Sequence, residues 1–218
     1  MPRARIPRIP QAGVLAFGVT IAGPEDVLSL WFGPVDDPAY PQSKPKLWWS
    51  KDAAVDADIR ARFHDTWAAA GRGELAGWSS TPRGRLAHIL VLDQLARNMH
   101  RDSPDMYALD DEAQDLVLEG LLRGDHRALI GQERNFFYMP LMHAENVALQ
   151  RLCVRLFAQA ADEARPADLE GAKSSLDFAR RHAVIVERFG RFPHRNEILG
   201  RPSTAEEQAF LQEPGSSF

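Results

Sequence analysis

The chain has 218 residues and a formal net charge of −4, with 44% hydrophobic and 26% charged residues. This length suits one well-buried core, and the mean hydropathy of −0.33 is typical of a soluble globular protein. An isoelectric point near 6.0 argues against a dedicated nucleic-acid binder, which carries a basic excess, and no stretch reaches the roughly 18 apolar residues of a membrane span.

The first 23 residues are expected to form a loosely attached arm ahead of a single domain over residues 24–218. Their basic start and the apolar run from Ala12 to Ala22 faintly resemble an export signal. Two prolines stand just before this run and no A-x-A cleavage site follows it, so we expect no export. The one cysteine, Cys153, cannot form an internal disulfide, which favours a small buried side chain in a reducing cytoplasm.

In the N-terminal half, the predicted helices carry start signals. Residues 23–33 place Pro24 in a first helical turn and end at a glycine. After a proline-rich loop, residues 50–73 begin with Ser50 or Asp52 as the cap. The segment TPRGRLAHILVLDQLARNMHR, which starts at Thr81, then predicts the longest clean helix before the middle of the chain.

Helical spacing continues through the second half. Residues 110–124 predict another helix that stops at a glycine, and residues 131–164 are long enough for two helices, which Pro140 should kink or divide. Residues 172–190 and a short closing segment over 203–213 complete the series. Because no useful alternating run suggests a strand, the sequence predicts an all-α protein.

Polar side chains repeat along one side of the helix predicted after Thr81. Asp93, Arg97 and Arg101 follow each other at intervals of four, with Gln94 and Asn98 one step round the helix. They form either a surface ladder of weak ion pairs, or a site in which Asp93 orients the planar guanidinium of Arg97 toward a carboxylate or phosphate.

A second polar group follows Pro140 in the segment NFFYMPLMHAEN. His143 and Glu145 are two residues apart, which is neither of the helical spacings that hold zinc or di-iron, so we expect no metal. One interpretation is that His143 is a core histidine bonded to a backbone carbonyl. The other is that His143 or Glu145 acts as a general acid or base at the helix break.

The third group lies in ERFGRFPHRN, residues 187–196. Pro193 forces an extended conformation after the helix, so Arg191, His194, Arg195 and Asn196 should lie on a rigid loop. They either tie down the C-terminus by pairing with acids such as Asp93, Glu145 or Glu206, or form a cationic pocket.

Together, the segments VLSLWFG, LDQLARN, FFYMPLMHAEN and ERFGRFPHRN resemble the bacterial family known as domain of unknown function 924. The resemblance covers nearly everything from Pro24 onward and implies a tetratricopeptide-like fold of stacked antiparallel helix pairs, with no established activity to transfer. Leu95 and Ala96 stand where family members often carry phenylalanine and proline, so we expect a straighter helix here.

We therefore expect one polar pocket for a small anionic or phosphorylated molecule, or a peptide, with no cofactor and no nucleic-acid or membrane partner. The candidate ligand-binding residues are Asp93, Gln94, Arg97, Asn98, Arg101, Tyr138, His182, Arg188, Arg191, Arg195 and Asn196. An alternative is an enzyme of hydrolysis or group transfer on an anionic substrate, with His143, His194 and Glu145 as candidate catalytic residues. A peptide-binding helical scaffold is the third hypothesis.

Overall fold

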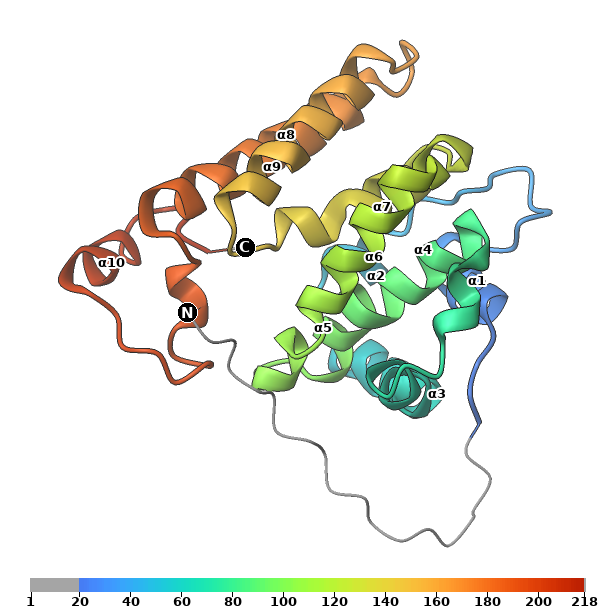
Figure 1. The fold of residues 1–218 in the computed structure, drawn as a ribbon, viewed down its shortest axis with the longest axis horizontal. Coiled ribbons are helices and arrows are strands. Elements are labelled where there is room, and N and C mark those ends of the chain that lie inside the picture. The colour runs from blue at the N-terminus through green and yellow to red at the C-terminus, as the bar shows by residue number, and fades with distance from the viewer. Residues whose placement is uncertain (1–19, 218) are drawn as a thin grey trace, which may run out of the picture.

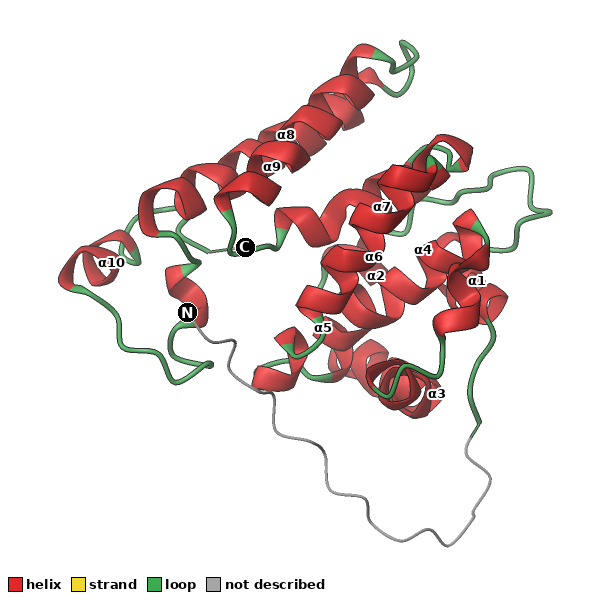
Figure 2. Cartoon of the chain, viewed as in Figure 1, coloured by secondary structure: helices red, strands yellow, loops and turns green. Residues whose placement is uncertain are grey.

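The computed structural model describes residues 20–217, and all regular structure in that range is helical (Figure 2). The α-helices are α1 Pro24–Phe32, α2 Pro45–Trp49, α3 Ala53–Gly71, α4 Pro82–Leu90, α5 Ala96–Met99, α6 Asp110–Arg123, α7 Gln132–Met142, α8 Val147–Asp162, α9 Leu169–Phe189 and α10 Ala205–Phe210. Short helical turns are η1 Ala76–Ser80, η2 Val91–Leu95, η3 Pro104–Tyr107, η4 Asp125–Ala128 and η5 Pro193–Arg195. The all-α prediction is confirmed, whereas most of the predicted N-terminal arm lies outside the described residues.

Side-chain caps fix several helix starts as the sequence indicated. Asp52, rather than Ser50, caps α3, because its carboxylate accepts a hydrogen bond of 2.9 Å from the Ala54 amide. Thr81 caps α4 by accepting from the Gly84 amide at 3.1 Å. Such caps satisfy amides that have no partner inside the helix.

The centre of the protein is the continuous helical run α4–η2–α5, whose residues 84–96 are all buried. It contacts α1, α3, α6 and α7, which surround it (Figure 1). The prediction of a clean α-helix is wrong at η2, which is a π-helical turn. A wide turn of this kind shifts the following residues by about one position, and the spacing of apolar residues in the sequence does not reveal it. Such π-turns occur frequently at functional sites.

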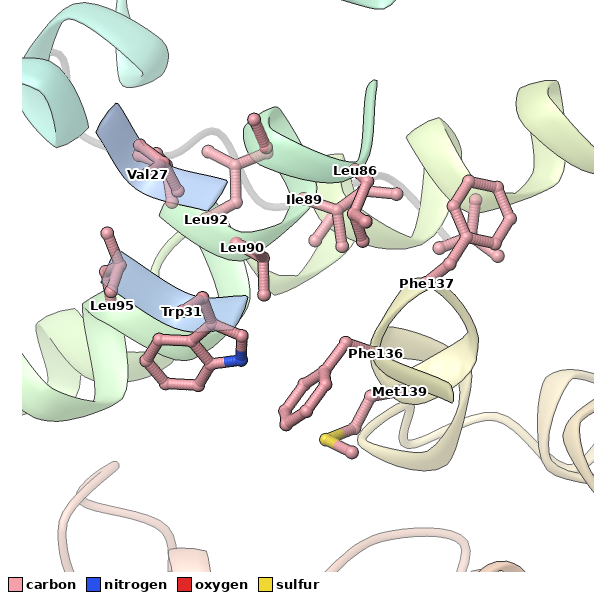
Figure 3. Close-up of a cluster of buried hydrophobic side chains, with 14 of the residues drawn as sticks. Val27, Trp31, Leu86, Ile89, Leu90, Leu92, Leu95, Phe136, Phe137 and Met139 are labelled. Carbon is pink, nitrogen blue, oxygen red and sulfur yellow. The ribbon is translucent and has the colours of Figure 1, made fainter. Parts of the chain in front are cut away.

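The main core lies between the central run, α1 and α7 (Figure 3). Trp31 meets the edge of Phe136 with ring centroids 5.5 Å apart, and Leu90 and Ile89 are fully buried beside them. Cys153 is also fully buried, as expected, and burial raises the pKa of its thiol.

Two helices occupy residues 131–164, but they are divided after Pro140 rather than at it. Pro140 lies inside α7, and the break spans residues 143–146, where the Asn146 side chain caps α8. The helices α8 and α9 then pack against each other as an antiparallel pair that projects from the body (Figure 1). None of the helices described in residues 20–217 is long and apolar enough to cross a membrane.

Candidate functional site

A cavity of about 640 Å³ is lined by side chains from α2, α5, α7, α9 and η5. Cavities of this size suit small-molecule ligands. Candidate residues from all three polar segments, together with His182 of α9, line it: Gln94, Arg97, Asn98, Arg101, His143, His182, His194 and Arg195. Segments separated by up to about a hundred residues in sequence therefore share one wall.

Arg97 is held by two carboxylates. Its Nη1 and Nη2 atoms donate to the two oxygens of Asp110 at 3.0 and 2.9 Å, and Nη1 also lies 3.0 Å from Oδ1 of Asp93. Burial lowers the pKa of Arg97, but the charges of Asp93 and Asp110 outweigh that effect and raise it above its ordinary value. The charge of Arg97 is thus fully matched within the protein.

Asp93 lies behind the cavity wall, fully enclosed in the π-turn η2. Its Oδ2 atom accepts from the Gln94 side chain at 2.6 Å, and its Oδ1 atom lies 2.7 Å from Nδ1 of His143. Burial raises the pKa of the Asp93 carboxyl, but Arg97 and His143 oppose this and hold the pKa well below its usual range. Asp93 is therefore an anion that orients its neighbours.

His143 closes α7 and points one ring nitrogen at this anion. Because the Asp93 carboxylate accepts a hydrogen bond, Nδ1 carries the proton and Nε2 holds the lone pair. Nε2 has no hydrogen-bond partner within residues 20–217, and His143 lines the cavity. Burial lowers the pKa of His143, although Asp93 partly opposes this, so the ring is neutral at physiological pH.

Arg195 is the least satisfied arginine of the cavity wall. It is 6% exposed, its Nη1 atom reaches Asp110 at only 3.4 Å, and its buried Nε has no hydrogen-bond partner within the described chain. The guanidinium lies over the rings of Tyr107 and Phe192, at 4.5 and 4.6 Å from their centroids. Burial and the nearby Arg97 lower the pKa of Arg195.

Two further histidines lie close to this end of the cavity. His182 bonds through Nδ1 to the Phe178 carbonyl at 2.8 Å, and its ring centroid is 6.2 Å from that of His143. Burial lowers the pKa of His182 to about 3 and the pKa of His194 to about 4. Both rings are neutral at physiological pH, so arginines supply the positive charge here.

The remaining two residues of the first polar segment are anchored by an acid that the sequence did not single out. The Asp56 carboxylate of α3 accepts a hydrogen bond of 2.6 Å from Nε of Arg101 and one of 2.8 Å from the side-chain amide of Asn98. Burial raises the pKa of Asp56, but Arg101 and Asn98 outweigh this and hold the pKa below its usual value. Arg101 thus reaches the cavity with its charge already paired.

Other candidate residues do not line this cavity: Tyr138, Glu145, Arg188, Arg191 and Asn196. Tyr138 packs on Phe157 in the core. Glu145 binds both terminal nitrogens of Arg201 and accepts from the Phe192 amide at 2.8 Å.

The C-terminal arginines outside the cavity follow the tie-down interpretation. Arg188 pairs with Glu206 at 3.0 Å, and Arg191 pairs with both oxygens of Glu207, at 2.7 and 2.8 Å. The Asn196 side chain also donates to Ser203 at 3.0 Å. These contacts fix the loop that carries Arg195, so the tie-down interpretation describes Arg188, Arg191 and Asn196.

Sequence reasoning missed the aromatic and acidic partners of the site. Asp110 opens α6 as one of three consecutive acids, which reads as an ordinary favourable first helical turn. Tyr107 and Trp49 lie in segments without clear periodicity. Only the structure shows that Asp110 forms ion pairs with both Arg97 and Arg195.

The fold and the cavity define an all-helical protein with a site lined by arginine, histidine, aromatic and methionine side chains. The chain belongs to the family described as bacterial protein of unknown function (DUF924), whose model matches residues 27–215. Among solved structures it is similar to the protein of unknown function ATU0120 from Agrobacterium tumefaciens, with 40% sequence identity and a TM-score of 0.66. The match covers 77% of this chain and 89% of that one. No curated protein matches the sequence.

Proposed function

We propose that the protein binds a small anionic ligand in the cavity, with the guanidinium of Arg195 as the main contact. The observation that carries this proposal is the state of Arg195, whose side chain lines a cavity large enough for a ligand while its buried Nε lacks a hydrogen-bond partner within residues 20–217. A buried cation with a single long ion pair is costly, and a bound anion removes that cost.

The distribution of charge at the wall supports an anion rather than a cation. The lining residues with a permanent positive charge are Lys51, Arg97, Arg101 and Arg195, and none of the lining residues of the described chain is aspartate or glutamate. The carboxylates of Asp56, Asp93 and Asp110 lie behind these groups. A ligand therefore meets donors first, and a planar guanidinium binds carboxylates and phosphates through paired hydrogen bonds.

A thermal-shift series with inorganic phosphate, acetate and succinate tests this proposal. Ligands that bind the native state raise the melting temperature by mass action. We expect such a rise with the wild-type chain and its loss in Arg195→Gln. The matched control is Arg188→Gln, because Arg188 lies on the same C-terminal segment but is exposed and paired outside the cavity.

Helical circular dichroism separates loss of binding from loss of folding. A folded Arg195→Gln variant that keeps the full anion-dependent shift would overturn the proposal. Equal loss of the shift in Arg188→Gln would do the same, because the effect would then not belong to the cavity.

The Asp93–His143 hydrogen bond favours a second candidate function, an enzyme of hydrolysis or group transfer on an anionic substrate. A neutral imidazole held by a carboxylate through Nδ1 has its Nε2 lone pair available to accept a proton from water or a hydroxyl group. Arg195 would stabilise negative charge that develops on the substrate.

A panel of phosphate and carboxylate esters tests this second function. Turnover that disappears in His143→Gln, and falls in Asp93→Asn, would support it if anion binding at Arg195 persists in both variants. Turnover that survives in a folded His143→Gln protein would exclude His143 as the base.

A further inference from the structure

Building on the proposed function, we infer that the ligand is amphipathic: an anionic head bound at Arg195 carries an apolar tail that lies between α7 and α9. The class of ligand is small carboxylates or phosphates with a hydrocarbon tail. The shape of the cavity and the chemistry of its two ends support this class.

Two of the helices that line the cavity, α7 and α9, run in the same direction (Figure 1). On α9, lining residues recur every three or four positions from Gly171 to His182, a span of about 16 Å. On α7 and its end, lining residues extend from Gln132 to His143, a span of about 16 Å. The contact between the His143 and His182 rings joins the two rows at one end.

That joined end carries the charge. His182 packs against Phe192 with ring centroids 5.7 Å apart, and Phe192 in turn lies against the guanidinium of Arg195. At the opposite end of the two rows, Gln132 of α7 and Ser174 of α9 are polar and uncharged. An anionic head therefore has one favourable end in this slot.

Between these ends the wall is mostly apolar, although Asn135 and Ser175 also line it. One helical turn from His143, Met139 lines the slot on α7, and Phe178 lines it one turn from His182 on α9. Phe157 of α8 and the indole rings of α2 complete this middle section. A fully polar anion, such as inorganic phosphate, leaves all of this surface in contact with water.

Two of these apolar side chains are unusually exposed for their size. The side chain of Trp49 is 62% exposed and that of Phe178 is 45% exposed, and both line the slot. Exposed aromatic side chains grouped in one concavity mark binding sites more often than scattered ones do. A tail that starts at Arg195 would cover Phe178 first and leave the slot near Gln132.

Calorimetric titration of the wild-type chain with acetate, butanoate, octanoate and dodecanoate tests the inference. A titration with octyl phosphate compares the phosphate head group with the carboxylate of octanoate. We expect the affinity to rise by up to about fourfold for each added methylene. The rise should level off between octanoate and dodecanoate, where the tail passes the apolar middle and reaches Gln132 and Ser174.

Variants locate the tail. Phe178→Ala should weaken octanoate binding at least about fivefold and leave acetate binding unchanged, since only the tail loses contact. Val184→Ala is the matched control, because Val184 lies on the same helix, is 63% exposed and does not line the cavity. Arg195→Gln should weaken every member of the series.

The possible failures are distinguishable. Anions that bind through Arg195 with no dependence on chain length overturn the inference and leave the proposed function intact. Octanoate binding that survives Arg195→Gln overturns the proposed function. Octanoate binding that is unaffected by Phe178→Ala, or equally weakened by Val184→Ala, also overturns the inference.

Discussion

Oδ1 of Asp93 lies 2.7 Å from Nδ1 of His143, so an anion in the central helical run fixes the imidazole at the end of α7. The same carboxylate neutralises Arg97, which lies 3.0 Å away. Asp93→Asn removes that buried charge, and we expect the free energy of unfolding to fall by about 3–5 kcal/mol. Urea unfolding measures this, with Asp56→Asn as the comparison at a more exposed ion pair. A loss below about 1 kcal/mol would contradict the role given to Asp93.

Arg97 and Arg195 should respond oppositely to loss of charge, although both contact Asp110. Arg97→Met removes the nearest cation from the two buried carboxylates of Asp93 and Asp110 and should cost about 3 kcal/mol or more. Arg195→Met removes a poorly compensated buried cation and should leave the stability of the ligand-free protein unchanged or raise it by about 1 kcal/mol. Chemical unfolding of both variants checks this. Similar large losses in both would make Arg195 a structural anchor instead of a ligand contact.

Acid should destabilise the protein in a window set by its buried histidines. Burial lowers the pKa of His182 to about 3, and the pKa values of His88 and His194 to about 4. Unfolded histidine has a pKa of about 6.5, so below that pH the unfolded chain binds more protons than the native state. The stability contributed by the neutral rings is complete above pH about 6.5 and is lost as the pH falls toward about 4.

The expected loss in that window is about 1.4 kcal/mol for each of these histidines per pH unit. Urea unfolding at pH 7.0, 6.0 and 5.0 measures this loss. In His182→Gln, the number of protons taken up on unfolding in this window should be smaller by one. Equal stability at pH 7.0 and 5.0 would show that these rings do not remain neutral in the native state. The depressed pKa of Asp93 adds a further loss below pH about 4, where that carboxyl protonates in the unfolded chain.

Two helical glycines give a paired test of the packing. A Cβ atom at Gly120 would lie 2.6 Å from Phe137 and 2.7 Å from the buried side chain of Arg85, so Gly120→Ala should cost about 1–3 kcal/mol. A Cβ atom at Gly171 meets nothing within 4 Å, so Gly171→Ala should stabilise α9 by up to about 1 kcal/mol. Thermal unfolding of both variants checks the pair, and a stabilising Gly120→Ala would contradict the packing of α6.

Much of the fold was predictable because local chemistry determines helix ends. Asp52, Thr81 and the glycine after α9 act where the sequence places them, since caps need only neighbouring residues. The π-turn η2 was not predictable, because the spacing of apolar residues in a sequence does not distinguish a π-turn from an α-helical turn. The same holds for α2, a five-residue helix whose Trp48 packs against Phe136 of a distant segment.

The candidate site was predictable as a set of polar segments but not as a network. The sequence indicated that Arg97 and Arg195 lie in polar groups, and it offered Asp93, Glu145 and Glu206 as acids. It could not assign Asp110, because the bond from Arg97 to Asp110 depends on the turn between two helices. Nor could it separate Arg195, which faces the cavity, from Arg191, which binds Glu207.

The most direct test of anion binding at Arg195 is a crystal structure of the full chain grown with octanoate or octyl phosphate. We expect an anionic oxygen within hydrogen-bond distance of the Arg195 guanidinium, with the hydrocarbon chain beside Phe178. A ligand bound elsewhere on the protein, with no contact to the Arg195 guanidinium, would contradict this expectation.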